Sequence, residues 1–134
     1  MAELQQICAT CFWLIPLAAE ACPYCGADLE VLSARDYSEK LISALCHPIS
    51  EVRMRAIIAL GWRKEEYAAQ PLLTLALKHP VDIVEGIAVA ECLEKLGADG
   101  EAALVKLAEQ HPAHTVRETA AAALHKRKIK NERL

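Results

Sequence analysis

Apolar residues recur at helical spacing through the central and C-terminal parts of the chain. Val52, Ala56 and Leu60 fall on one face of a helix, and Leu72 and Leu75 do the same further on. Neither stretch shows the strict alternation of apolar and polar residues that a half-buried strand requires. The pattern therefore predicts a series of amphipathic helices.

The helical pattern returns with a fixed period of 32 residues, which the dipeptide His-Pro marks at 47–48, 79–80 and 111–112. In the same register, the matching residues are Val52, Val84 and Val116; Ala56, Ala88 and Ala120; Leu60, Cys92 and Leu124; Leu72 and Leu104; and Leu75 and Leu107. A period of this length is typical of stacked supersecondary units, each too small to bury its apolar face alone.

Each period divides into two short helices. Gly61 and the charged run 63–66 separate the helices of the first unit, and the run 97–100, with two glycines, separates those of the second. Proline lacks a backbone N–H and favours a helix start, so the His-Pro pairs mark the seams between units. We expect a helix over about 34–46 before the first full unit and a last helix over about 115–128.

This repeat resembles the HEAT-like repeats of the phycobilisome-lyase type, in which a polar turn precedes Val-Arg, a small-residue helix that ends in Ala-Leu-Gly, and a Leu-rich second helix. The matching stretches are Val52-Arg53, Ala59-Leu60-Gly61 and 72–77, then Val116-Arg117 and Ala123-Leu124. The resemblance covers about residues 36–127. It implies an all-α solenoid of about three helical-pair layers, although Glu85 replaces the arginine in the middle unit.

Composition and charge agree with one small helical domain, or one domain with an appendage. The chain has 134 residues, of which 54% are hydrophobic and only 4% aromatic. The formal charge of −3 gives no overall field that would attract nucleic acid. No apolar run is long enough to span a membrane, and no secretory signal is recognisable, so we expect a cytoplasmic protein with reduced thiols.

The N-terminal stretch holds two C-x2-C pairs, Cys8 with Cys11 and Cys22 with Cys25. Four thiolates in this pattern form the tetrahedral ligand set of structural zinc, and Gly26 suits the left-handed turn that follows such a pair. The stretch is similar to short zinc-ribbon domains, which read C-x2-C, a short apolar stretch, then C-P-x-C-G-x-x-L. We expect one structural zinc per chain, with no open coordination position for catalysis.

Two alternatives to zinc stay open. Four cysteines can also hold other metals, such as iron. The sequence Cys22-Pro23-Tyr24-Cys25 is also the active-site tetrapeptide of glutaredoxins, but that redox chemistry needs a βαβ domain, and the chain has only 21 residues before the motif.

The apolar run 12–17 lies between the two cysteine pairs. A module of under about forty residues rarely buries such a run unaided. We expect the run to dock on the helix over 34–46, with exposure of that helix face to water as the alternative.

Several residues outside this stretch resemble sites. His47, His79 and His111 occupy successive helix layers, which lie about 8–10 Å apart, so they are too distant to share one metal ion, and we expect roles in the turns. Cys46 and Cys92 have no C-x2-C partner and are predicted to be small buried hydrophobic residues.

Arg53, Glu85 and Arg117 occupy one register of the repeat, which predicts opposite charges side by side along the stack. Exposed pairs of this kind contribute about 0–1 kcal/mol each. The residues that follow them form no His-Glu pair of the kind through which some HEAT-like enzymes bind iron. A hydroxylase activity therefore has no ligands in this sequence.

The C-terminus offers two further surfaces. Residues 125–134 include five Lys or Arg and one Glu, a tail that can contact phosphate backbones but lacks the interleaved aromatic residues that stack on bases. In the helix before it, Ala121 and Ala122 predict a flat apolar edge at which a second copy of the chain or a partner helix can continue the stack.

Together these features predict a zinc ribbon over residues 1–32 and HEAT-like helical repeats over 33–134 with a short basic tail. No nucleophile, base and oxyanion donor occur together, which favours a non-enzymatic protein–protein interaction scaffold or adaptor. Two alternatives remain: a phycobilin-lyase-like or other enzyme-associated HEAT protein, and a nucleic-acid-associated accessory protein that uses the basic tail.

Overall fold

The computed structural model describes residues 5–132 except 9–12, 17 and 27–33. Its elements are strands β1 (Gln5–Ile7) and β2 (Leu14–Pro16), helices α1 (Ala34–Ala44), α2 (Ser50–Arg63), α3 (Ala69–Lys78), α4 (Ile83–Glu94), α5 (Gly97–Gln110) and α6 (His114–Glu132), and the 3-10 helix η1 (Glu66–Ala68). The two strands pair antiparallel, with Gln6 opposite Ile15. The predominance of helix confirms the predicted all-α class.

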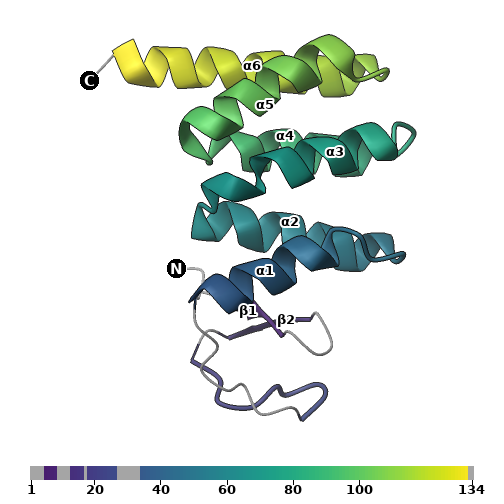
Figure 1. Ribbon diagram of the computed structural model, residues 1–134, viewed down its shortest axis with the longest axis vertical. Coiled ribbons are helices and arrows are strands. Elements are labelled where there is room, and N and C mark those ends of the chain that lie inside the picture. The colour runs from purple at the N-terminus through teal and green to yellow at the C-terminus, as the bar shows by residue number, and fades with distance from the viewer. Residues whose placement is uncertain (1–4, 9–12, 17, 27–33, 133–134) are drawn as a thin grey trace.

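The helices stack in two rows, as Figure 1 shows. Helices α2, α4 and α6 pack side by side in one row, while α1, α3 and α5 form the other. The pairs α1–α2, α3–α4 and α5–α6 also pack across the rows. This arrangement confirms the predicted solenoid of about three helical-pair layers.

One continuous apolar core runs between the two rows. Leu72 of α3 and Leu104 of α5, which occupy the same register of the repeat, are both completely buried. Burial of a leucine side chain contributes about 1.5–3 kcal/mol relative to exposure. Neighbouring helices pack both within a pair and between pairs, so the burial depends on the stack, as expected for a repeat array.

The seams between units differ slightly from the prediction. Helices α2, α4 and α6 begin two or three residues after the proline of each His-Pro pair, so these prolines lie in the turns. In the second unit the break falls at 95–96, and the predicted breaker Gly100 lies in the first turn of α5. A Cβ atom at Gly100 would collide with the carbonyl oxygen of Leu93, so this glycine allows α5 to approach the end of α4.

Helix α2 ends with a residue in the left-handed region. Lys64 has φ 54° and ψ 48°, and its N–H donates to the carbonyl of Gly61 at 3.2 Å. The N–H of Glu65 donates to the carbonyl of Leu60 at 3.3 Å. These two bonds form a Schellman motif, in which the left-handed position usually belongs to glycine.

Two of the three repeated histidines hold their turns in the same way. His47 Nδ1 accepts a hydrogen bond from the N–H of Ile49 at 3.1 Å, and His111 Nδ1 accepts one from the N–H of Ala113 at 3.0 Å. The predicted turn role is therefore confirmed for these two residues.

The repeated arginine closes the same turn. Arg53 Nη1 donates to the carbonyl oxygens of His47 and Pro48, at 2.8 and 3.1 Å. Arg117 Nη1 donates in the same way to both carbonyls of the third His-Pro pair, at 2.8 and 2.9 Å. The arginine six residues after each of these histidines thus satisfies carbonyl groups that lie outside any helix.

The middle unit carries Glu85 at this register, and its carboxylate is 1% exposed. Arg53 Nε donates to Glu85 Oε1 at 2.5 Å, and His79 Nδ1 lies 3.0 Å from Oε2. The predicted juxtaposition of opposite charges is therefore confirmed for Arg53 and Glu85, but the expected exposure of the pair is wrong, because this register faces the seam between units rather than solvent. Among the described residues, the Arg117 side chain donates its hydrogen bonds to backbone carbonyls.

Helix α6 is longer than the predicted 115–128 and includes much of the basic tail, up to Glu132. Arg127 of this helix donates from Nη1 to the carbonyl of Glu94 at 2.7 Å, so one basic side chain caps the end of α4. Within the described parts of the chain, no helix combines the length and apolar character needed to cross a membrane.

Candidate metal centre and inter-helix groove

Three of the four predicted metal ligands come together in the N-terminal part of the chain. The thiol sulfurs of Cys8, Cys22 and Cys25, here called the cysteine cluster, all lie within 4.8 Å of one another. Cys8 and Cys22 are buried, while Cys25 is exposed. The fourth predicted ligand, Cys11, lies outside the described residues.

The geometry of the cysteine cluster fits a thiolate-bound metal. The Sγ atoms of Cys8 and Cys25 are 3.7 Å apart, and neither residue forms a disulfide. A tetrahedral ion with metal–sulfur bonds of about 2.3 Å places its ligand sulfurs about 3.8 Å apart. The three cysteines can therefore hold a metal ion without a large rearrangement.

Local backbone structure brings the thiols together. The N–H of Cys8 donates to the carbonyl of Trp13 at 2.9 Å, which closes the loop between β1 and β2. The N–H groups of Tyr24 and Cys25 point at Cys22 Sγ, at 3.4 and 3.5 Å. Gly26 has φ +75°, as predicted for the turn after the second pair. Amide groups directed at sulfur favour the thiolate form that binds metal.

The N-terminal hairpin also contacts α2. Strand β1 packs near α2, and the guanidinium carbon of Arg55 lies 3.9 Å from the centre of the Trp13 ring. Trp13 also contacts the ring of Tyr24, with 5.5 Å between centroids. The contact with α2 was not predicted, and docking of the apolar run 12–17 on the helix over 34–46 stays a prediction, because part of that run lies outside the described residues.

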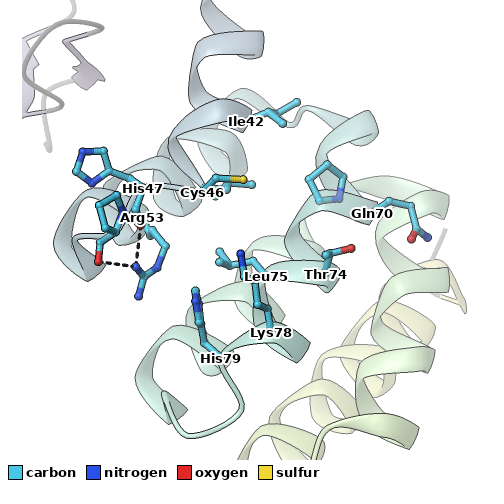
Figure 2. A pocket seen from close by; sticks show the side chains of 12 residues that line it. Ile42, Cys46, His47, Arg53, Gln70, Thr74, Leu75, Lys78 and His79 are labelled. Atoms are coloured by element: carbon cyan, nitrogen blue, oxygen red, sulfur yellow. Dashed lines mark hydrogen bonds between the residues drawn. The ribbon is translucent and has the colours of Figure 1, made fainter.

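A second candidate site lies between α1 and α3. The inter-helix groove, with a volume of about 580 Å³, is lined by Ile42, Leu45, Cys46, His47, Pro48, Arg53, Gln70, Pro71, Thr74, Leu75, Lys78 and His79. Figure 2 shows these side chains around the opening, with α1 and its following turn on one side and α3 on the other. The volume is in the range of small-ligand and peptide side-chain pockets.

The groove exists because α1 and α3 do not close on each other as the next two helices of the row do. Helices α3 and α5 pack directly, and Ala103 of α5 is completely buried. One repeat earlier, the same register holds Pro71, which lines the groove.

The lining combines an apolar surface with hydrogen-bond donors. Ile42, Leu45 and Leu75 supply apolar surface from both helices. Lys78 is exposed at the end of α3, and among the described residues no carboxylate forms an ion pair with it. Arg53 is already engaged by Glu85 and backbone carbonyls. The lining contains no aspartate or glutamate.

The two isolated cysteines differ in their surroundings. Cys92 is buried as predicted, and desolvation by burial, partly offset by Lys95, raises the pKa of its thiol to about 12. This thiol is therefore unreactive near neutral pH. Cys46 is exposed and lines the groove, so the prediction that it is buried is wrong. Cys46 lies in the turn that follows α1, where its side chain faces the groove.

His111 is a buried titratable group in the turn between α5 and α6. Its side chain is 1% exposed. Desolvation lowers its pKa from the ordinary value of 6.5, an effect that hydrogen bonds with the backbone of Ala76 and Ala113 oppose and the charge of Arg117 reinforces. The folded protein thus favours the neutral imidazole.

Sequence reasoning missed the groove residues, because Gln70, Thr74 and Lys78 have the polar character of an ordinary exposed helix face. The lining residues share no spacing or motif that would have marked a binding surface in the sequence. The arginine–carbonyl contacts, in contrast, had a signal, since the spacing from histidine to arginine is six residues in both His47–Arg53 and His111–Arg117.

The stacked pairs and the open groove define this protein as an α-solenoid built from helical repeats. A family model described as HEAT repeats matches residues 17–90, which is more than half of the 134 residues. The chain therefore belongs to the HEAT repeat family, and the match does not single out the phycobilisome-lyase type. Neither curated proteins nor solved structures gave a match in the other two comparisons.

Proposed function

We propose that this protein is a non-enzymatic protein–protein interaction scaffold. The observation that carries the proposal is the inter-helix groove, an open surface between α1 and α3 that is lined by apolar and polar side chains. HEAT repeats generally serve as interaction scaffolds, because stacked helices present continuous surfaces to a partner.

The experiment for this function places a photo-crosslinking amino acid in the groove. The full-length protein carries the crosslinker at Thr74, and a matched variant carries it at Val105, which is 41% exposed on α5. In native extract, a scaffold gives a discrete protein adduct at Thr74 that is absent at Val105. Absence of any discrete adduct, or the same adducts at both positions, contradicts a partner in the groove.

We further propose that Cys8, Cys11, Cys22 and Cys25 hold one structural zinc ion. The separation of 3.7 Å between two of the thiol sulfurs and the N–H groups directed at Cys22 support a tetrahedral thiolate site. Iron bound by the same thiolates and redox-active cysteines are the competing assignments. When bound, zinc supplies folding free energy to a hairpin that is otherwise too small to be stable.

The metal proposal predicts about one zinc ion per chain in protein purified without chelator. Cys25→Ser should lower the zinc content, because it removes one of the four proposed ligands, whereas Cys46→Ser should leave it unchanged. Elemental analysis measures the metal, and circular dichroism should show that the repeats stay helical in both variants. Iron in place of zinc, or equal metal content in Cys25→Ser, contradicts the proposal.

We propose a division into a zinc ribbon over residues 1–32 and HEAT repeats over 33–134. Two separate buried clusters support this division: Cys8, Ile15 and Cys22 form one, and the repeat core forms the other. The family match begins at residue 17, within the proposed ribbon. The thiolate site suits a reducing compartment, so the proposed location is the cytoplasm.

The end of the solenoid is a proposed self-association surface. Ala121 and Ala122 are exposed on α6, where no further helix among the described residues covers them. Small side chains allow close helix approach, so a second copy of the chain can pack there. Light scattering should then show a dimer that Ala121→Glu converts to a monomer. A monomeric wild type with no mass change in the variant contradicts self-association through this edge.

A further inference from the structure

We propose that the inter-helix groove binds an acidic, apolar peptide segment of a protein partner. This inference rests on the proposed scaffold function and names the chemistry of the partner. Its basis is the contrast between the chain, whose formal charge is −3, and the groove, whose lining includes Lys78 and Arg53 but no carboxylate.

The cation available to a ligand is Lys78. Arg53 also lines the groove, but its guanidinium donates to Glu85 at 2.5 Å and to two backbone carbonyls. It therefore stabilises the structure around the groove and is not available to bind a ligand. Lys78 is exposed, and Figure 2 shows its side chain extending from α3 toward the opening. A carboxylate that enters the groove meets this ammonium group without competition from an acidic side chain of the lining.

The groove also offers apolar surface for the aliphatic side chains of the proposed peptide. The lining is apolar at the half-buried Ile42 of α1 and at the edges of the buried Leu45 and Leu75, and the volume of about 580 Å³ accommodates one or two aliphatic side chains. Gln70 and Thr74 lie on α3, where their side chains can bond the backbone of an extended peptide. The combination of apolar surface, the Gln70 amide, the Thr74 hydroxyl and one ammonium group fits a peptide better than a bare phosphate backbone.

Cys46 provides a native handle for the test, because it is exposed in the groove, whereas the Cys92 thiol is buried. Two probes are used, acetyl-Cys-Leu-Glu-amide and acetyl-Cys-Leu-Lys-amide, each as a mixed disulfide with cysteamine. The Cys46 thiolate attacks the probe sulfur, forms the protein–peptide disulfide and releases cysteamine as a thiol. A fixed concentration of β-mercaptoethanol brings the exchange to equilibrium, and mass spectrometry measures the labelled fraction at Cys46.

The expected result is a preference of roughly threefold or more for the glutamate probe on the zinc-loaded full-length protein, since an exposed ion pair changes affinity by this order. Lys78→Gln should abolish the preference and Lys78→Glu should reverse it. The matched control Lys106→Glu makes the same change in net charge on the exposed face of α5 and should leave it intact. Salt at about 1 M should weaken the preference, because it shortens the Debye length to about 3 Å.

Equal labelling by the two probes, or a preference that survives Lys78→Glu, overturns the inference. A short oligothymidylate that blocks labelling in wild type but not in Lys78→Gln also overturns it, because the groove then recognises phosphate. Helix content is measured in each Lys78 variant, since a lysine in the last turn also interacts with the helix dipole. If Thr74 still crosslinks a partner while the probes show no preference, the scaffold stands and only the acidic chemistry fails.

Discussion

The buried ion pair between Arg53 and Glu85 gives a sharp test of how the repeats are joined. The two residues come from α2 and α4, at the same register of adjacent units, and their side chains are 9% and 2% exposed. Replacing Glu85 by alanine leaves the Arg53 Nε donor without its acceptor in the seam. We therefore expect Glu85→Ala to destabilise the whole solenoid rather than one helix.

The expected loss is about 3 kcal/mol, at the lower end of the range for breaking a buried pair by removal of one partner. The lower end applies because Arg53 Nη1 keeps its two carbonyl acceptors and Nη2 lies 4.0 Å from Asp82. Glu85→Arg restores the arginine of the other two units, yet it should cost more than Glu85→Ala, since it places two like charges in one buried seam.

Urea unfolding measures this loss. With a slope of about 1–3 kcal/mol per molar urea, a loss of about 3 kcal/mol lowers the midpoint by about 1–3 M. A double-mutant cycle of Arg53→Ala and Glu85→Ala should give a coupling energy of about 2 kcal/mol. Arg117 is the matched control, because it bonds only carbonyls of its own turn among the described contacts. Its coupling to Glu85 should be near zero.

The reasoning fails if Glu85→Ala costs less than about 1 kcal/mol, which is the typical value for a solvent-exposed pair. It also fails if Arg53→Ala and Glu85→Ala are additive within about 0.5 kcal/mol. Either result would mean that the pair is not formed in the seam and that leucine and alanine packing alone joins the units.

Three further predictions concern the repeats. Leu104→Ala should destabilise the protein by about 2–5 kcal/mol, because the leucine is completely buried in the seam. Val105→Ala, at the exposed neighbouring position, should cost less than about 1 kcal/mol. Equal losses of unfolding free energy for the two variants in urea would contradict the helix register. Lys64→Gly should raise the free energy of unfolding by about 0.5–1 kcal/mol, since glycine adopts φ 54° without strain, and no gain would argue against a left-handed end of α2. Burial lowers the pKa of His111 in the folded protein below the ordinary value of 6.5, so just below pH 6.5 the unfolded chain binds a proton more readily than the folded chain does. The free energy of unfolding should therefore fall as the pH drops below 6.5. His111→Asn should remove that part of the pH dependence. An unchanged profile in the variant would assign the loss to another group.

The period of the repeat was enough to predict the helical architecture. A period of 32 residues with leucine and alanine at fixed positions can bury its apolar faces only by stacking, so helix pairing and the buried positions of Leu72 and Leu104 followed from the pattern. The cysteine cluster was likewise predictable, because C-x2-C spacing places two thiols on one tight turn. The first conclusion depended on regular spacing along the chain, and the second on a ligand pattern that is recognisable from two C-x2-C pairs.

Tertiary structure decided the features that depend on how two neighbouring units approach each other. The pattern showed Arg53 and Glu85 in one register but could not show that the register faces a buried seam, because charged residues at regular spacing are usually solvated. It also could not show that Trp13 meets Arg55, since the two residues are far apart in the chain. The groove has the same origin, because it is lined by side chains of α1 and α3 that the sequence does not show to lie beside one another.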